Sequence, residues 1–214
     1  MTVRLRLTLA GLLLLLGVSC APTPTPDAPP ALLSVFAAAG SSPWLDEAFA
    51  CAAEVNAVLS VSADPRAADL SLRLGEPAAL ASPAFQIDSE ELLVAVSRQS
   101  PLGDLSLEQT RALFAGGDPS AQVWVYADGE EMQGLFDQLV MAGQPVTSFA
   151  RLAASPQEMA AALIENPAAV GILPRRLLTQ DLRSIHPLGS LPVLAILREE
   201  PQGALKDLIA CMQQ

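Results

Sequence analysis

Few residues of this chain have the types and spacing that catalysis needs. The single histidine, His186, precedes a proline in a stretch typical of a loop, and no serine is flanked by glycines like a hydrolase nucleophile. Asp128, Glu130 and Glu131 lie close together in the sequence, but neighbouring helix residues point about 100° apart and rarely converge on one substrate. One histidine and two distant cysteines make no zinc ligand cluster. We therefore expect no enzyme, no metal site and no cofactor.

The first twenty residues predict export and a lipid anchor. Arg4 and Arg6 precede an apolar run at 7–18, which reads as a signal peptide and is shorter than the about 20 residues of a membrane helix. The run Leu16-Gly17-Val18-Ser19-Cys20 resembles the lipobox of bacterial lipoproteins, although Gly17 stands where that motif has leucine. The resemblance implies lipidation of Cys20 and an extracytoplasmic protein anchored to the cell membrane. Ordinary cleavage after Cys20 is the alternative.

A proline-rich segment follows at 21–31. Proline lacks an amide donor and restricts the residue before it, so this segment predicts a semi-rigid tether that spans roughly 30 Å. A disordered end left by processing is the alternative. The folded part then begins near Ala31 and is long enough for one large domain or two small ones.

The charge balance limits the classes of partner. Without Arg4 and Arg6, 10 basic residues remain of the 12 and face 23 acidic ones, a net charge of −13. This charge argues against nucleic acid and against an anionic membrane face as binding partners. An even pair of cysteines, Cys51 and Cys211, suggests a disulfide in an exported protein, and two buried free thiols are the alternative.

Short β-like runs alternate with helical patterns along the chain, which predicts an α/β fold with mostly parallel sheets. A helix begins near Pro43, and Ser106 with Gln109 and Ser155 with Glu158 predict capping boxes. Further helices are predicted at 130–142 and 202–212. Strands are predicted at 32–37, 58–61, 69–72, 92–97, 122–126, 170–173 and 193–197.

Four stretches resemble phosphate-type substrate-binding proteins of ABC importers. The main stretch runs from Ser100-Pro-Leu-Gly to Leu-Phe-Ala-Gly116, and it carries Leu105-Ser-Leu-Glu-Gln109 at the family's spacing. The other three, in the family's order, are Ala39-Gly40-Ser41-Ser42, the segment 166–174 and the segment 200–205.

The resemblance implies a two-lobed type II periplasmic-binding-protein-like fold with an interlobe cleft. The first lobe would comprise 32–97 and 173–214, and the second lobe 98–172. This division places Cys51 and Cys211 in the same lobe and so favours their disulfide. Both lobes are short for the family.

In that family, helix N-termini and neighbouring hydroxyls hold an anion in the cleft. Gly40, Ser41 and Ser42 fit one half of such a site, although Ser42 could simply cap its helix. Trp44 beside them is expected in the core.

The other half-site departs from the family. Where the family reads aspartate-glycine-serine-glycine-threonine-arginine, this chain has Asp128-Gly129-Glu130-Glu131-Met132-Gln133. Two carboxylates at this place argue against phosphate, unless Glu130 and Glu131 point to solvent. Arg73 could contact a ligand, pair with Glu130 or Glu131 across the closed cleft, or be solvated. The pair at 175–176 is expected on a solvated face.

The sequence therefore predicts a monomeric, lipid-anchored solute-binding protein that closes around a small polar ligand other than phosphate and presents it to an ABC permease. The alternative is a degenerate member of the fold that acts as a sensor or surface interaction lipoprotein. A filled cleft, with an apolar patch exposed elsewhere, would favour this alternative.

Overall fold

The computed structural model describes residues 29–77 and 79–214. The lipobox and most of the tether lie outside these residues. Every helix in the described part is too short or too polar to span a membrane. The described strands form one eight-stranded sheet in the order β2-β1-β3-β8-β4-β7-β5-β6. Their bounds are Ala31–Ala37 (β1), Ala57–Val61 (β2), Leu70–Leu74 (β3), Ala84–Ser97 (β4), Gln122–Tyr126 (β5), Arg151–Ala153 (β6), Ala169–Pro174 (β7) and Leu182–Leu197 (β8).

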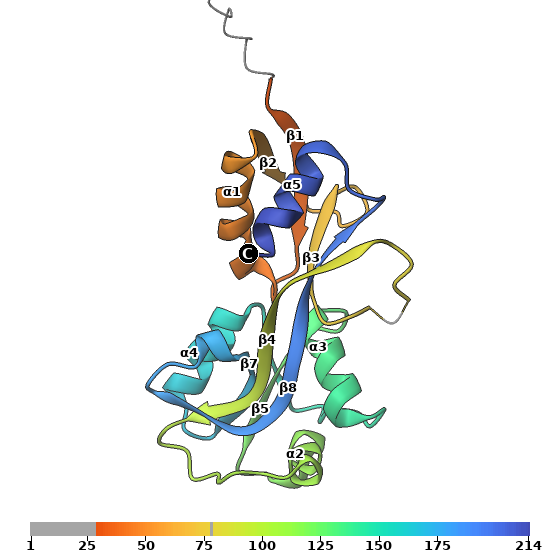
Figure 1. Cartoon of the computed structure of the whole chain (residues 1–214). Coiled ribbons are helices and arrows are strands. Elements are labelled where there is room, and N and C mark those ends of the chain that lie inside the picture. Colours follow the sequence, from red (N-terminus) through yellow and green to blue (C-terminus); the bar gives the residue numbers. More distant parts are fainter. Residues whose placement is uncertain (1–28, 78) are drawn as a thin grey trace, which may run out of the picture.

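Two long strands, β4 and β8, hold the sheet together. They pair antiparallel from Ala84 opposite Ile196 to Ser97 opposite Leu182. Elsewhere β1 pairs in parallel with β2 and β3, and β5 pairs in parallel with β6 and β7. Figure 1 shows β4 and β8 running between two groups of elements, with β1, β2, β3, α1 and α5 at one end and β5, β7, α2, α3 and α4 at the other. We call these groups the first and the second lobe. The lobe boundaries predicted at 97 and 173 stay predictions.

The helices begin where the sequence supplies the expected signals. Ser106 accepts a hydrogen bond from the Gln109 amide, and the Gln109 side chain accepts one from the Ser106 amide, which confirms the predicted capping box. Ser155 caps its helix through the Glu158 amide, but the Glu158 carboxylate accepts from Ala154 instead of Ser155. The helices are α1 (Leu45–Glu54), α2 (Leu107–Ala112), α3 (Glu131–Phe136), α4 (Pro156–Glu165) and α5 (Gly203–Met212), with short helical turns at η1 (Ser42–Trp44), η2 (Leu113–Gly117), η3 (Asp137–Met141) and η4 (Arg175–Leu177).

The outer helices of the first lobe are covalently joined. A disulfide links Cys51 of α1 to Cys211 of α5, whose Cα atoms lie 5.7 Å apart, so the predicted pairing is confirmed. In the second lobe α4 packs on β7 and α3 on β5. Phe114 and Phe136 are fully buried there, with ring centroids 4.5 Å apart.

Two strands are much longer than predicted, and a third strand, β6, was not predicted. β4 starts eight residues earlier than the predicted strand, and β8 includes the His186-Pro187 stretch that the sequence indicated as a loop. The pairing of β4 with β8 skips Leu188, between Pro187 and Gly189, so a bulge accommodates the proline and the glycine. The Nδ1 atom of His186 lies 2.9 Å from the Leu105 carbonyl, and the ring thus joins β8 to the segment before α2.

Candidate functional site

The two lobes meet where α3 of the second lobe packs against β3 of the first. A turn at Asp128-Gly129 brings the chain to α3, and Gly129 permits it because its φ is +88°. The Glu130 amide then donates to the Ala127 carbonyl at 3.1 Å, and helical hydrogen bonds follow. This turn directs the start of α3 at the first lobe.

Two apolar side chains of α3 fill the contact. A Cβ atom on Gly40 would lie 2.9 Å from Cγ of Met132, and one on Gly75 would lie 2.7 Å from Cδ2 of Leu135. Residues three apart share one face of a helix, so Met132 and Leu135 pack together against two glycines of the first lobe. The interlobe contact is therefore occupied by the protein's own side chains at both glycines.

Between these two packing points, Glu131 pairs with Arg73. Oε1 of Glu131 lies 2.8 Å from Nε of Arg73, and the side chains are 5% and 32% exposed respectively. Nε and both carboxylate oxygens are buried, and within the described part of the chain none of them has a hydrogen bond of good geometry. Burial raises the pKa of Glu131 to about 7, although the Arg73 charge and the Leu74 backbone oppose the rise. The Glu131 carboxylate is thus buried and only partly compensated.

The two predicted serine donors bond to their own loop and strand. The fully buried Ser41 hydroxyl donates to the Leu72 carbonyl at 2.6 Å, and the Ser42 hydroxyl donates to the Ala39 carbonyl at 3.0 Å. Ser42 is the first residue of η1, and the N-cap positions of η1 and α1 belong to Ser41 and Trp44, so Ser42 acts neither as an N-cap nor as a free donor. Because each hydroxyl has one proton, neither can donate to a ligand in this arrangement.

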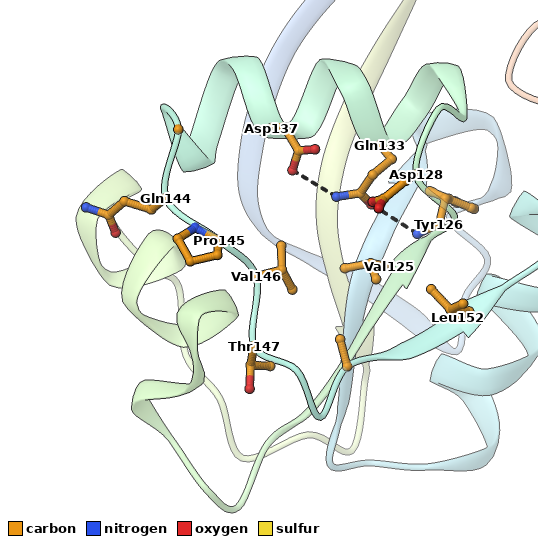
Figure 2. Close-up of a pocket in the computed structure, with 12 residues that line it drawn as sticks. Val125, Tyr126, Asp128, Gln133, Asp137, Gln144, Pro145, Val146, Thr147 and Leu152 are labelled. Atoms are coloured by element: carbon orange, nitrogen blue, oxygen red, sulfur yellow. Dashed lines mark hydrogen bonds between the residues drawn. The ribbon is translucent and has the colours of Figure 1, made fainter.

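The remaining predicted residues divide between two pockets. Gly129 and Glu130 lie at a pocket of roughly 300 Å³ beside the Glu131–Arg73 pair, together with Glu76. Asp128 points the other way, into a pocket of roughly 610 Å³ within the second lobe (Figure 2). The structure therefore brings Gly40, Arg73 and Glu131 together and separates Asp128 from them.

The second-lobe pocket lies between α3, β5 and the segment 143–152 (Figure 2). The buried Gln133 fixes one wall, because its Oε1 accepts from the Tyr126 amide and its Nε2 donates to Asp137. Burial raises the pKa of Asp137, the Gln133 bond lowers it, and the charge of Asp128 raises it further. Gln133 thus has a structural role at this wall.

A cluster that the sequence did not predict lies at β4, where this strand meets η1 and η4. Arg176 contacts the buried Glu90 carboxylate through its Nε, and its guanidinium carbon lies 3.6 Å from the centre of the Trp44 ring. The Trp44 indole donates to Asp88 at 2.9 Å. Trp44 is buried and both arginines are exposed, as predicted, although the Arg176 guanidinium also contacts Glu90 and Trp44. The only local signal is the run of acidic residues within β4.

No group of three or more histidine, cysteine, aspartate or glutamate side chains within 29–77 and 79–214 is placed to hold a metal ion. The chemistry that the interlobe site supports is pairing of a carboxylate or oxyanion with a guanidinium.

Comparison with known proteins identifies the architecture. No family model and no curated protein matches the sequence. Among solved structures, the chain is similar to a phosphate ABC transporter substrate-binding protein with bound phosphate from Clostridium perfringens (TM-score 0.74, 12% identity, 85% of this chain and 92% of that one). It is also similar to an ABC-type phosphate transport receptor from Vibrio cholerae (0.67, 15%, 85% and 93%) and to the reduced regulatory domain of OxyR2 from Vibrio vulnificus (0.62, 10%, 87% and 96%). These neighbours are binding and regulatory domains. At such identities the likeness establishes the fold, and this chain has the two-lobed type II periplasmic-binding-protein-like α/β fold.

Proposed function

We propose that this protein is a lipid-anchored, extracytoplasmic sensor or interaction module built on the solute-binding fold, with lobes joined by its own side chains. The packing of Met132 on Gly40 and of Leu135 on Gly75 carries this proposal. A solute-binding protein closes its cleft on a captured ligand and needs that ligand's contacts to hold the closed state. Here the contacts come from α3 itself.

An exposed apolar surface supports an interaction role. Phe149 is 89% exposed and Leu152 is 63% exposed, and both lie at the β6 edge of the sheet. Each of them lines a pocket, and Thr147 lines both pockets. Exposed apolar side chains beside pockets are typical of protein interfaces.

Anchoring follows from the predicted lipobox. If Cys20 carries the lipid, Cys20→Ser should move the protein from the membrane fraction to the soluble extracytoplasmic fraction. Cell fractionation with immunoblotting measures this directly. Unchanged membrane retention of Cys20→Ser would count against the lipid anchor. It would not test the interaction role.

A second candidate function is solute capture for an ABC permease. The fold favours it, and so does the residual interlobe pocket, which carries both Arg73 and the carboxylates of Glu76 and Glu130. Such mixed charge suits a small polar ligand with both signs of charge.

A thermal-shift screen of the mature chain separates the two candidates. Oxyanions, amino acids, polyamines and sugars would each be tested at about ten times a millimolar Kd, where a true ligand raises Tm by about 3 to 6 °C. The proposal expects shifts below about 1 °C throughout. A reproducible shift with one class, accompanied by a smaller radius of gyration in X-ray scattering, would favour solute capture.

A further inference from the structure

The Glu131 carboxylate has the surroundings of a bound anion. Nε of Arg73 lies 2.8 Å from Oε1, and Oε2 would lie 3.3 Å from a Cβ atom at Gly40. The carboxylate therefore rests against the backbone at Gly40 on one side and against a guanidinium on the other. These two groups come from the first lobe, whereas the carboxylate comes from the second.

The pair is tight but poorly bonded. Nε of Arg73 and both oxygens of Glu131 are buried, and within the described chain none of them has a hydrogen bond of good geometry. A buried guanidinium N–H without an aligned acceptor can accommodate a better-placed oxyanion. The site is therefore occupied by a carboxylate that fits it imperfectly.

We propose that Glu131 is a built-in anion that fills a latent oxyanion site formed by Arg73 and Gly40, and that it excludes free anions from that site. This inference rests on the proposed function, because it gives the chemical reason why the lobes stay joined without a solute. A ligand fixed to the same chain acts at a high effective concentration, and a free anion of millimolar affinity cannot displace it.

Shortening the Glu131 side chain should open the site. The Glu131→Ala substitution removes the carboxylate and leaves its space open to the adjoining pocket of roughly 300 Å³. It also leaves Nε of Arg73 without its counter-charge. The class of ligand expected there is a small oxyanion, for which inorganic phosphate and sulfate are the probes.

The test compares variants of the mature chain in phosphate, in sulfate, and in chloride of equal ionic strength. We expect about 10 mM phosphate or sulfate to raise the Tm of Glu131→Ala by about 3 °C or more over chloride, and to leave the unsubstituted protein within about 1 °C. Arg73→Ala/Glu131→Ala should lose the response. Glu131→Gln, which fills the same space, and Glu130→Ala, which leaves Glu131 in place, should show none.

Each outcome has a separate meaning. If neither Glu131→Ala nor the unsubstituted protein responds to phosphate or sulfate, the latent site is refuted while the proposed function stands. If the unsubstituted protein responds as strongly as Glu131→Ala, the proposed function is refuted as well. A response that survives in Arg73→Ala/Glu131→Ala overturns the role of Arg73. Should Glu131→Ala not fold, Glu131→Ser leaves a comparable space and takes its place with the same outcomes.

Discussion

Two buried carboxylates, Glu90 and Glu131, pair with arginines in this molecule, and their surroundings differ. Both side chains are 5% exposed. Glu90 accepts from Arg176 and from the Glu91 amide, and Arg176 also stacks on Trp44. Glu131 faces Arg73 and the Leu74 backbone, and it has no hydrogen bond of good geometry in the described chain.

The difference teaches that burial alone does not decide what an ion pair does. A buried pair whose oxygens are bonded can fix a structure, whereas a poorly bonded one costs desolvation and stays sensitive to protons and to competing ligands. The pair of Glu90 with Arg176 connects β4 to η4 and is suited to fix the relative position of these two elements. The pair of Glu131 with Arg73 joins the two lobes and is suited to respond to protons and to competing ligands.

The largest expected effect on stability comes from the pair of Glu90 with Arg176. Arg176→Ala leaves Glu90 buried without its partner and removes the stacking on Trp44, so we expect a loss of about 3 kcal/mol in unfolding free energy. Arg175 is the matched control, since its side chain is 57% exposed in its pair with Glu91 and its loss should have little effect on stability. Urea denaturation of both variants measures the difference. Equal losses would mean that the two pairs are equivalent and that burial of Glu90 adds nothing.

The next effect is a pH dependence from Glu131. Its pKa is about 7 in the folded protein against an ordinary 4.5, so the native state binds the proton more tightly than the unfolded chain does. The stability that this proton contributes is complete below about 4.5 and is lost as the pH rises through 7. Between about pH 5 and pH 8, the protein should lose about 2 kcal/mol more than Glu131→Gln does. Parallel stability curves for the two proteins would show that Glu131 does not titrate in this range.

The sequence predicted the local elements better than the contacts between lobes. The strand at 122–126 and the capping box at Ser106 are confirmed, because each depends only on neighbouring residues. The first half of β4 was missed because polar residues interrupt its apolar pattern, and the middle of β8 because Pro187 and Gly189 are typical of loops. The pair of Arg73 with Glu131 was one of three alternatives, and only the fold, which brings β3 and α3 together, decides among them.

Leucine substitutions of the two carboxylates should have a smaller effect on stability, with opposite signs. Glu131→Leu removes both oxygens that lack aligned hydrogen bonds and leaves Arg73, a third exposed, able to turn towards solvent. We therefore expect it to stabilise the protein by about 1 kcal/mol near pH 8. Glu90→Leu is the counterpart, and it should destabilise because it removes the hydrogen bonds that Glu90 accepts from Arg176 and from the Glu91 amide. Thermal unfolding of both variants tests this, and destabilisation by Glu131→Leu would show that its pair is as favourable as that of Glu90.

The smallest effect on stability is expected at Gly40, which lies against the Glu131 side chain. In Gly40→Ala the new Cβ would lie 2.9 Å from Met132 Cγ and 3.3 Å from the Glu131 carboxylate, so both flexible side chains must shift. We expect a loss of only about 1 kcal/mol, because the atoms that must move are the ends of side chains. Gly103→Ala is the control, since nothing lies within 4 Å of its Cβ position.

The same shift should let water reach Glu131 and lower its pKa towards the ordinary value, so the stability of Gly40→Ala should depend less on pH near 7. The pair at Glu90, which is held by its own hydrogen bonds, should be unaffected. A pH dependence as steep as in the unsubstituted protein would mean that Met132 and Leu135 alone bury Glu131. In that case the pH response of Glu131 depends on α3 and not on Gly40.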